Sequence, residues 1–211
     1  MVSVSSDGMA KVWNFESGAL LRTLPPRLNA DLVPVPTTCC AVSPTGVWLA
    51  TGANDGLVDL YYLDSGEKVA SMEKHPGQVK ELRFSPNDDL LASCSAEGAV
   101  VIWKVPDASV VFDHKPGKSA SLGSTPASMG KVHTVSFPLN AQSQAQEFLT
   151  AGDRAICLWD LASQSQLSAV VNVELSAPGA LFNVISVRIL GDGSLAAYTY
   201  TDGEASGGDA A

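Results

Sequence analysis

One short pattern occurs four times in this chain, and it constrains the fold more than any other feature. In each copy an acidic residue ends a stretch of small residues, and an aromatic residue follows six positions later. The successive acids lie 48, 42 and 56 residues apart. Self-similarity with a period of about 40–45 residues is typical of propellers built from four-stranded units. The four pairs are Asp7 and Trp13, Asp55 and Tyr61, Glu97 and Trp103, and Asp153 and Trp159.

The segment from Thr38 to Met72 illustrates one repeating unit. It contains four short stretches with alternating apolar residues, separated by Ser43–Gly46, Asn54–Gly56 and Asp64–Gly66. These separators contain the Asn, Asp, Gly, Pro and Ser residues that tight turns favour. The pattern therefore predicts a four-stranded antiparallel meander.

The same reading along the whole chain predicts 17 strands in one domain that covers residues 1–204. Incomplete units are expected at the two ends, with three strands at the start and two near the end. The linkers Pro25–Pro36 and His114–Gly130 connect units, and the length of the second predicts a mobile surface loop. The predicted units are a partial blade at 1–24, blades at 37–73, 78–113 and 131–171, a partial blade at 183–203, and a disordered tail at 205–211.

Net charge, cysteine pattern and the length of apolar stretches limit the kinds of partner and the cellular compartment that we expect. The net charge of −9 repels phosphate backbones, so no direct nucleic-acid binding is expected. The four cysteines form no Cys-x-x-Cys pair, and adjacent Cys39 and Cys40 should point to opposite faces of a strand. With no signal peptide and no apolar stretch long enough to span a bilayer, we expect an intracellular protein, cytoplasmic or nuclear, without membrane contact.

Several staggered motifs resemble the WD40 repeat family. They are Ser6-Asp7-Gly8 with Val12-Trp13, Ser43-Pro44-Thr45-Gly46 with Asn54-Asp55-Gly56, Phe84-Ser85-Pro86 with Ile102-Trp103, and Ala151-Gly152-Asp153 with Leu158-Trp159-Asp160. The resemblance covers roughly residues 1–204. It implies an all-β fold, a β-propeller of four-stranded antiparallel blades. A closed ring of this family usually has seven blades and about four are present here, so remaining blades or a second chain would have to close it.

The resemblance also implies a hydrogen-bonded polar set in each blade: a His, a Ser or Thr, an Asp in the tight turn and a Trp. The best match is His75, Ser93, Glu97 and Trp103, with Glu where the family has Asp. In the preceding unit Tyr61 replaces Trp, and no His precedes it. The partial matches elsewhere are Thr51 with Asp55, Thr150 with Asp153 and Trp159, and Ser3 with Asp7 and Trp13.

Catalytic and cofactor motifs are incomplete. Gly117-Lys118-Ser119 resembles the end of a phosphate-binding loop, but Phe112 stands where that loop requires Gly. No Gly-x-Ser-x-Gly elbow occurs. The repeated acids belong to different units, so they should lie too far apart for paired acid–base chemistry. The sequence therefore predicts no catalytic residue, no metal site and no cofactor.

The resemblance to this family implies a non-catalytic scaffold that mediates protein–protein interactions within a multiprotein complex. The expected contact surface is the face that carries the tight turns and inter-blade loops. Two alternatives remain: an enzyme with its site at the propeller channel, and a subunit of a nucleolar or RNA-processing assembly that acts through protein contacts. The candidate partner-binding residues on this face are Asn54, Lys74, His75, Lys115 and Lys118.

Overall fold

The computed structural model describes residues 1–115, 132–138, 147–152, 155–171, 182–189 and 195–201 of the chain. No helix that could cross a membrane is found within these ranges. The strands are β1 (Val2–Val4), β2 (Ala10–Trp13), β3 (Leu20–Leu24), β4 (Thr37–Val42), β5 (Trp48–Ala53), β6 (Leu57–Tyr62), β7 (Lys68–Glu73), β8 (Val79–Phe84), β9 (Leu90–Ser95), β10 (Val100–Lys104), β11 (Val110–His114), β12 (Val132–Ser136), β13 (Glu147–Gly152), β14 (Ala155–Asp160), β15 (Ser165–Val171), β16 (Phe182–Ile189) and β17 (Leu195–Thr201).

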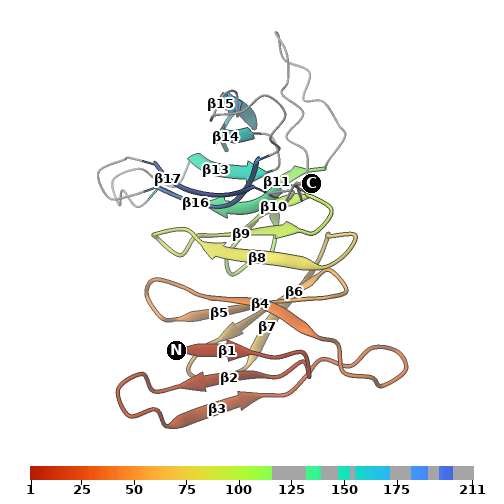
Figure 1. Cartoon of the computed structure of the whole chain (residues 1–211). Coiled ribbons are helices and arrows are strands. Elements are labelled where there is room, and N and C mark those ends of the chain that lie inside the picture. Colours follow the sequence, from red (N-terminus) through yellow and green to blue (C-terminus); the bar gives the residue numbers. More distant parts are fainter. Residues whose placement is uncertain (116–131, 139–146, 153–154, 172–181, 190–194, 202–211) are drawn as a thin grey trace, which may run out of the picture.

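The strands form antiparallel sheets that follow one another in chain order (Figure 1). In every sheet, strands that are consecutive in the sequence pair with each other, as in a meander. The described sheets are β1–β3, β4–β7, β8–β11, β12–β15 and the hairpin β16–β17. The predicted fold class, an all-β arrangement of four-stranded antiparallel units in an incomplete ring, is confirmed.

Strand positions follow the turn residues closely. The sequence pattern predicts strands over residues 57–62, 79–84, 100–104 and 155–160, and β6, β8, β10 and β14 have these bounds, because Gly, Asp or Pro lies close to both ends of each. Where the bounds of a strand differ from the predicted ones, they differ by one or two residues. For example, β9 extends to Ser95, two residues beyond the predicted end at Ser93, and both Cys94 and Ser95 are fully buried.

Three hydrophobic clusters lie between successive sheets, and each of these is built from side chains of both sheets. The cluster between β4–β7 and β8–β11 contains Val58, Leu60, Leu82 and Trp103. Because a middle sheet is covered on both faces, its central strands are buried almost continuously: β10 has four consecutive buried residues. The corresponding clusters on either side are Ala10, Val12, Leu24 and Leu49 between the first two sheets, and Ile102, Phe112, Phe148 and Trp159 between β8–β11 and β12–β15.

The adjacent cysteines illustrate how one strand serves two clusters. Cys39 packs against the cluster between the second and third sheets, whereas Cys40 packs against the cluster between the first and second. The two thiols therefore point to opposite faces of β4, as the period-2 geometry of a strand requires. Burial raises the pKa of the Cys39 thiol to about 12, which keeps it protonated and unreactive.

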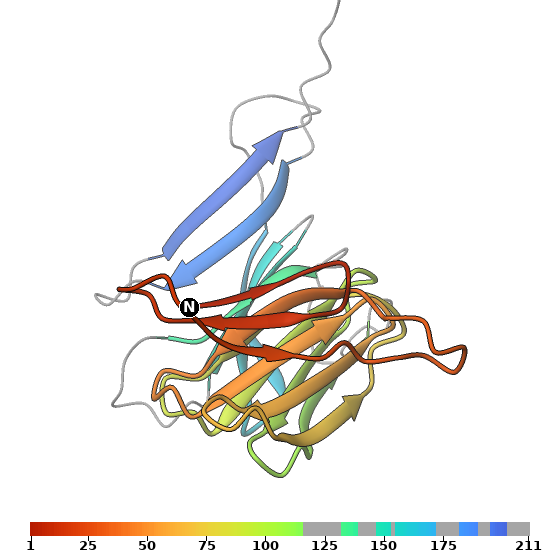
Figure 2. The ribbon, with the colours of Figure 1, turned by 90° about the horizontal axis from the view of Figure 1, so that it is seen from below.

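The connection between β3 and β4 extends away from the sheets (Figures 1 and 2). Its base contacts two tight turns. The Thr37 hydroxyl donates to the Gly8 carbonyl at 3.0 Å, and the Asn54 amide donates to the Pro36 carbonyl at 2.9 Å. This connection therefore lies on the face that carries the turns β1–β2 and β5–β6. The turn β2–β3 lies at the opposite end of the strands, because the chain reverses at each turn.

Candidate functional site

Each of three described sheets contains an indole–hydroxyl hydrogen bond between neighbouring strands. The indole N–H of Trp103 donates to Ser93 at 2.8 Å, and that of Trp159 donates to Thr150 at 2.8 Å. In the first sheet Trp13 donates to Ser3, also at 2.8 Å. Trp103 and Trp159 are both 2% exposed, because the preceding sheet covers them. Trp103 and Trp159 thus each combine a core contact between sheets with a hydrogen bond within their own sheet.

His75 extends this arrangement in the third sheet. Its Nε2 lies 2.7 Å from the Ser93 hydroxyl, whose oxygen also accepts the Trp103 indole N–H. The expected bond from His75 to Glu97 is not formed, since Nδ1 of the buried His75 ring has no hydrogen-bond partner. The Glu97 carboxylate lies against the backbone of Gly77 instead. Glutamate is one methylene longer than the aspartate usual at this position, and its carboxylate is displaced accordingly.

We expect the stability of the protein to decrease on acidification because of His75. Burial lowers the pKa of His75 from 6.5 to about 4, an effect that the charges of Asp113 and Glu97 only partly offset. As the pH falls, the unfolded chain therefore takes up a proton at His75 before the folded protein does. The contribution of the neutral, buried imidazole to stability is complete above pH 6.5 and is lost as the pH falls to 4. The loss should be about 3 kcal/mol.

Urea unfolding of the wild type and of His75→Gln at several pH values between 7 and 4 measures this loss. Glutamine can still bond to Ser93 but does not titrate. Burial also lowers the pKa of His114, so only the difference between the two proteins reports on His75. Equal pH dependence in both proteins would contradict the assignment.

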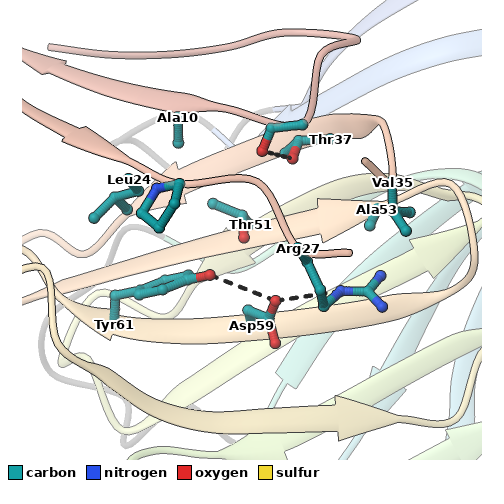
Figure 3. A pocket seen from close by; sticks show the side chains of 11 residues that line it. Ala10, Leu24, Arg27, Val35, Thr37, Thr51, Ala53, Asp59 and Tyr61 are labelled. Atoms are coloured by element: carbon teal, nitrogen blue, oxygen red, sulfur yellow. Dashed lines mark hydrogen bonds and ion pairs between the residues drawn. The ribbon is translucent and has the colours of Figure 1, made fainter. Parts of the chain in front are cut away.

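A different polar set occupies the second sheet, where Tyr61 replaces the tryptophan (Figure 3). Its centre is Asp59, which is only 5% exposed. The Tyr61 hydroxyl points to the Asp59 carboxylate, and Nε of Arg27 lies 3.6 Å from it, while the far end of the Arg27 guanidinium forms an ion pair with Asp55. The remaining partners of Asp59 are the Ser71 hydroxyl and the Lys68 ammonium, the latter at 3.5 Å. Burial, with the Asp59 charge beside it, raises the pKa of Tyr61 to about 12.

Strand register places Arg27 and His75 at equivalent positions. Leu24 in the first sheet and Met72 in the second occupy the same register position. Each pairs with the residue that lies three positions before the aromatic residue of the repeat in that sheet. Arg27 follows Leu24 by three residues, and His75 follows Met72 by three. Sequence reasoning missed Arg27 because it looked for a histidine. The constant offset of three residues after the outer strand is the signal that could have found it.

The space beside this set is too small for an organic ligand. The cavity has a volume of about 10 Å³ and is lined by Arg27, Thr51, Asp59 and Tyr61 among others. A volume of this size holds at most about one water molecule. A larger hollow of about 340 Å³ lies beside β4 and β8, lined by Cys40, Arg83 and apolar residues such as Val42 and Phe84. Its lining contains no carboxylate or imidazole, and the described residues include no cluster that could hold a metal ion.

The repeated acids act mainly on their own turns. Asp7 accepts from the amide of Met9 at 2.9 Å, and Asp55 accepts from the amide of Leu57 at 3.3 Å. In the third sheet the Ser95 hydroxyl accepts the corresponding turn amide, so Glu97 has no such role. Asp153 lies outside the described residues.

The candidate partner-binding residues differ in accessibility. Asn54, Lys74 and Lys115 are exposed, and Lys74 is paired with Asp113 at 3.6 Å. His75 is only 6% exposed, so its side chain does not face solvent and is not available to a partner. Lys118 lies outside the described residues.

Comparison with known proteins identifies the repeats. The model of the WD40 family (WD domain, G-beta repeat) matches residues 26–61 and 66–104. Three relatives are "Cilia- and flagella-associated protein 52" of Sus scrofa, 29% identical over 50% of this chain and 16% of its own length; "Pre-rRNA-processing protein IPI3" of Yarrowia lipolytica, 29% identical over 80% and 36%; and "Ribosome biogenesis protein ERB1" of Ajellomyces capsulatus, 29% identical over 63% and 18%.

The matched regions thus span between 16% and 36% of the lengths of these relatives. The first matched repeat contains strands of the second sheet and includes Asp59. The second contains β7 of the second sheet and β8–β10 of the third, and includes His75. The repeat pattern of the sequence and the antiparallel sheets agree with these matched segments. The chain therefore contains WD40 repeats at residues 26–61 and 66–104.

Proposed function

We propose that this chain is a non-catalytic scaffold that mediates protein–protein interactions within a multiprotein complex. The WD40 repeats carry this proposal. The buried polar groups support it, because His75, Ser93 and Asp59 are engaged in contacts within and between sheets rather than directed into a site for substrate. Enzymatic activity at the channel is the alternative, and the lining of the larger hollow disfavours it, because it offers no carboxylate or imidazole for acid–base chemistry.

The relatives favour one particular setting as a second candidate. Of the three relatives, the two that match the larger shares of this chain, 80% and 63%, are named for pre-rRNA processing and for ribosome biogenesis. A subunit of such an assembly that acts through protein contacts agrees with the net charge of −9, which disfavours direct contact with RNA. On this proposal the protein is intracellular, cytoplasmic or nuclear.

The proposed organisation is a single partial propeller over residues 1–204, with the remaining blades or a second chain closing the ring. An uncovered sheet edge or face is a template for association, so the ring must be completed by a protein surface. The proposed contact face remains the one with the tight turns and inter-blade loops, and Asn54, Lys74 and Lys115 are its accessible candidates.

The experiment is purification of the tagged full-length gene product from its native cells, followed by size-exclusion chromatography with and without ribonuclease. We expect elution at a mass above that of the protein alone, with the same co-purifying proteins after ribonuclease treatment. Elution as a lone protein with nothing above background would contradict the scaffold. Dissociation by ribonuclease would contradict assembly through protein contacts.

A further inference from the structure

The connection between β3 and β4 presents large apolar side chains to solvent. Leu28, Leu32 and Val33 are 47%, 76% and 54% exposed, although they lie within six residues of one another. We call residues 28–33 the apolar tip. Single exposed apolar residues are normal on protein surfaces, but a group of three on one projecting segment indicates a site of interaction (Figure 2).

The apolar tip has a defined conformation. The Asn29 side chain accepts from the amides of Asp31 and Val33 at 3.0 and 2.9 Å, and the Asn29 carbonyl accepts from the Leu32 amide at 3.0 Å. Leu32 has φ of 59°, a left-handed conformation that leucine rarely adopts. The chain thus maintains an unusual backbone geometry whose result is an exposed leucine, and such geometry is concentrated at functional segments.

The base of the connection is held against the second sheet, while its tip is exposed to solvent. Val35 is buried, and its amide donates to the Arg27 carbonyl at 2.9 Å. The Arg27 side chain is held by Asp55 and Asp59 of the second sheet. A segment that is ordered before binding loses little conformational freedom on binding, which favours affinity.

The charges near the tip indicate the partner. Asp31 is exposed at the tip, and Asp7 is exposed on the turn that contacts the base of the connection. Arg27, the one cation between residues 25 and 36, is neutralised by its ion pairs. The surroundings of the apolar tip are therefore acidic, in a chain of net charge −9. Complementary charge across an interface steers association and excludes wrong partners.

We propose that the apolar tip docks into an apolar pocket with a basic rim on a partner protein. Leu32 and its neighbours fill the pocket, and Asp31 faces the Lys or Arg side chains around it. This inference rests on the proposed scaffold function and names the chemistry of one contact that the scaffold makes.

The test begins with a photoreactive amino acid at position 32 of the full-length protein in its native cells. The cross-linked protein is identified and purified, and its Kd is measured for the wild type and for Leu32→Asn, Asp31→Lys and Phe15→Asn. Asparagine tolerates the left-handed conformation at position 32, so the first variant keeps its fold. Phe15 is the matched control, since it is 82% exposed but lies on the turn β2–β3 at the opposite end of the strands.

We expect Leu32→Asn to weaken binding at least tenfold, Asp31→Lys to weaken it severalfold and lower the association rate, and Phe15→Asn to leave it within twofold. Unchanged affinity of Leu32→Asn would overturn the docking proposal while the scaffold function stands. Cross-links only to a second copy of the chain would also overturn it. Absence of any partner in the native cells would overturn both.

Discussion

Replacement of Trp103 by alanine should lower the free energy of unfolding by about 3–5 kcal/mol, the range for a large aromatic removed from a core. Trp103 is 2% exposed and packs between the second and third sheets with Val58 and Leu60. Its removal creates a cavity between sheets and takes away the indole donor to Ser93. Both effects act in the same direction. Urea unfolding monitored by circular dichroism measures the change.

Two further variants separate these contributions. Trp103→Phe retains much of the ring volume but loses the indole N–H, so the hydrogen-bond part alone should cost about 1 kcal/mol. Trp13→Ala removes the equivalent indole of the first sheet, which is only half-buried, and should cost less than Trp103→Ala. A loss below about 1 kcal/mol for Trp103→Ala would contradict its placement in a core of this kind.

The fold could be predicted from the sequence because its determinants are local. Turn residues such as Asn54 and Gly56 set the strand ends, and the alternation between them sets which side chains face a neighbouring sheet. Gly56 shows how strict this is: it has φ of 88°, and a side chain there would collide with the backbone of His75. Patterns of this kind are visible in one sequence without knowledge of the tertiary contacts.

The hydrogen-bonded polar sets were harder to predict from the sequence. They depend on the position of the functional group at the end of each side chain, and not only on the position of its backbone. Glu97 occupies the expected turn position, yet its longer side chain takes the carboxylate away from His75. Arg27 lies in a proline-rich linker that gave no reason to expect a buried contact. Only the three-dimensional path of that linker brings its guanidinium to Asp55 and Asp59.

The same reasoning explains why Asp59 was not singled out. Register places it where the third sheet has Val101 and the fourth has Cys157, both buried and neither charged. An acid on an alternating strand normally indicates a solvent-facing position, but this one faces a neighbouring sheet. It is tolerated because Arg27, Lys68 and two hydroxyl groups surround it. A buried charge of this kind is stable only with partners.

Replacement of Arg27 by methionine should therefore lower the free energy of unfolding by about 3 kcal/mol, the lower end of the range for removal of one partner from a buried ion pair. Asp59 would keep Lys68 and Ser71, which is why the upper end is not expected. Thermal and urea unfolding at neutral pH measure the change. Because Arg27 also holds the base of the connection between β3 and β4, proteolysis within residues 25–36 should become faster.

A double variant distinguishes an ion pair from simple packing. In Arg27→Met with Asp59→Val, the second substitution removes the carboxylate that the first leaves without its guanidinium. Apolar replacement of both members of a buried pair is often close to neutral, so the double variant should regain most of the stability lost in Arg27→Met. The valine matches the residue that the third sheet carries at this register. Additive losses from the two substitutions would show that Arg27 and Asp59 act independently and would contradict the pairing.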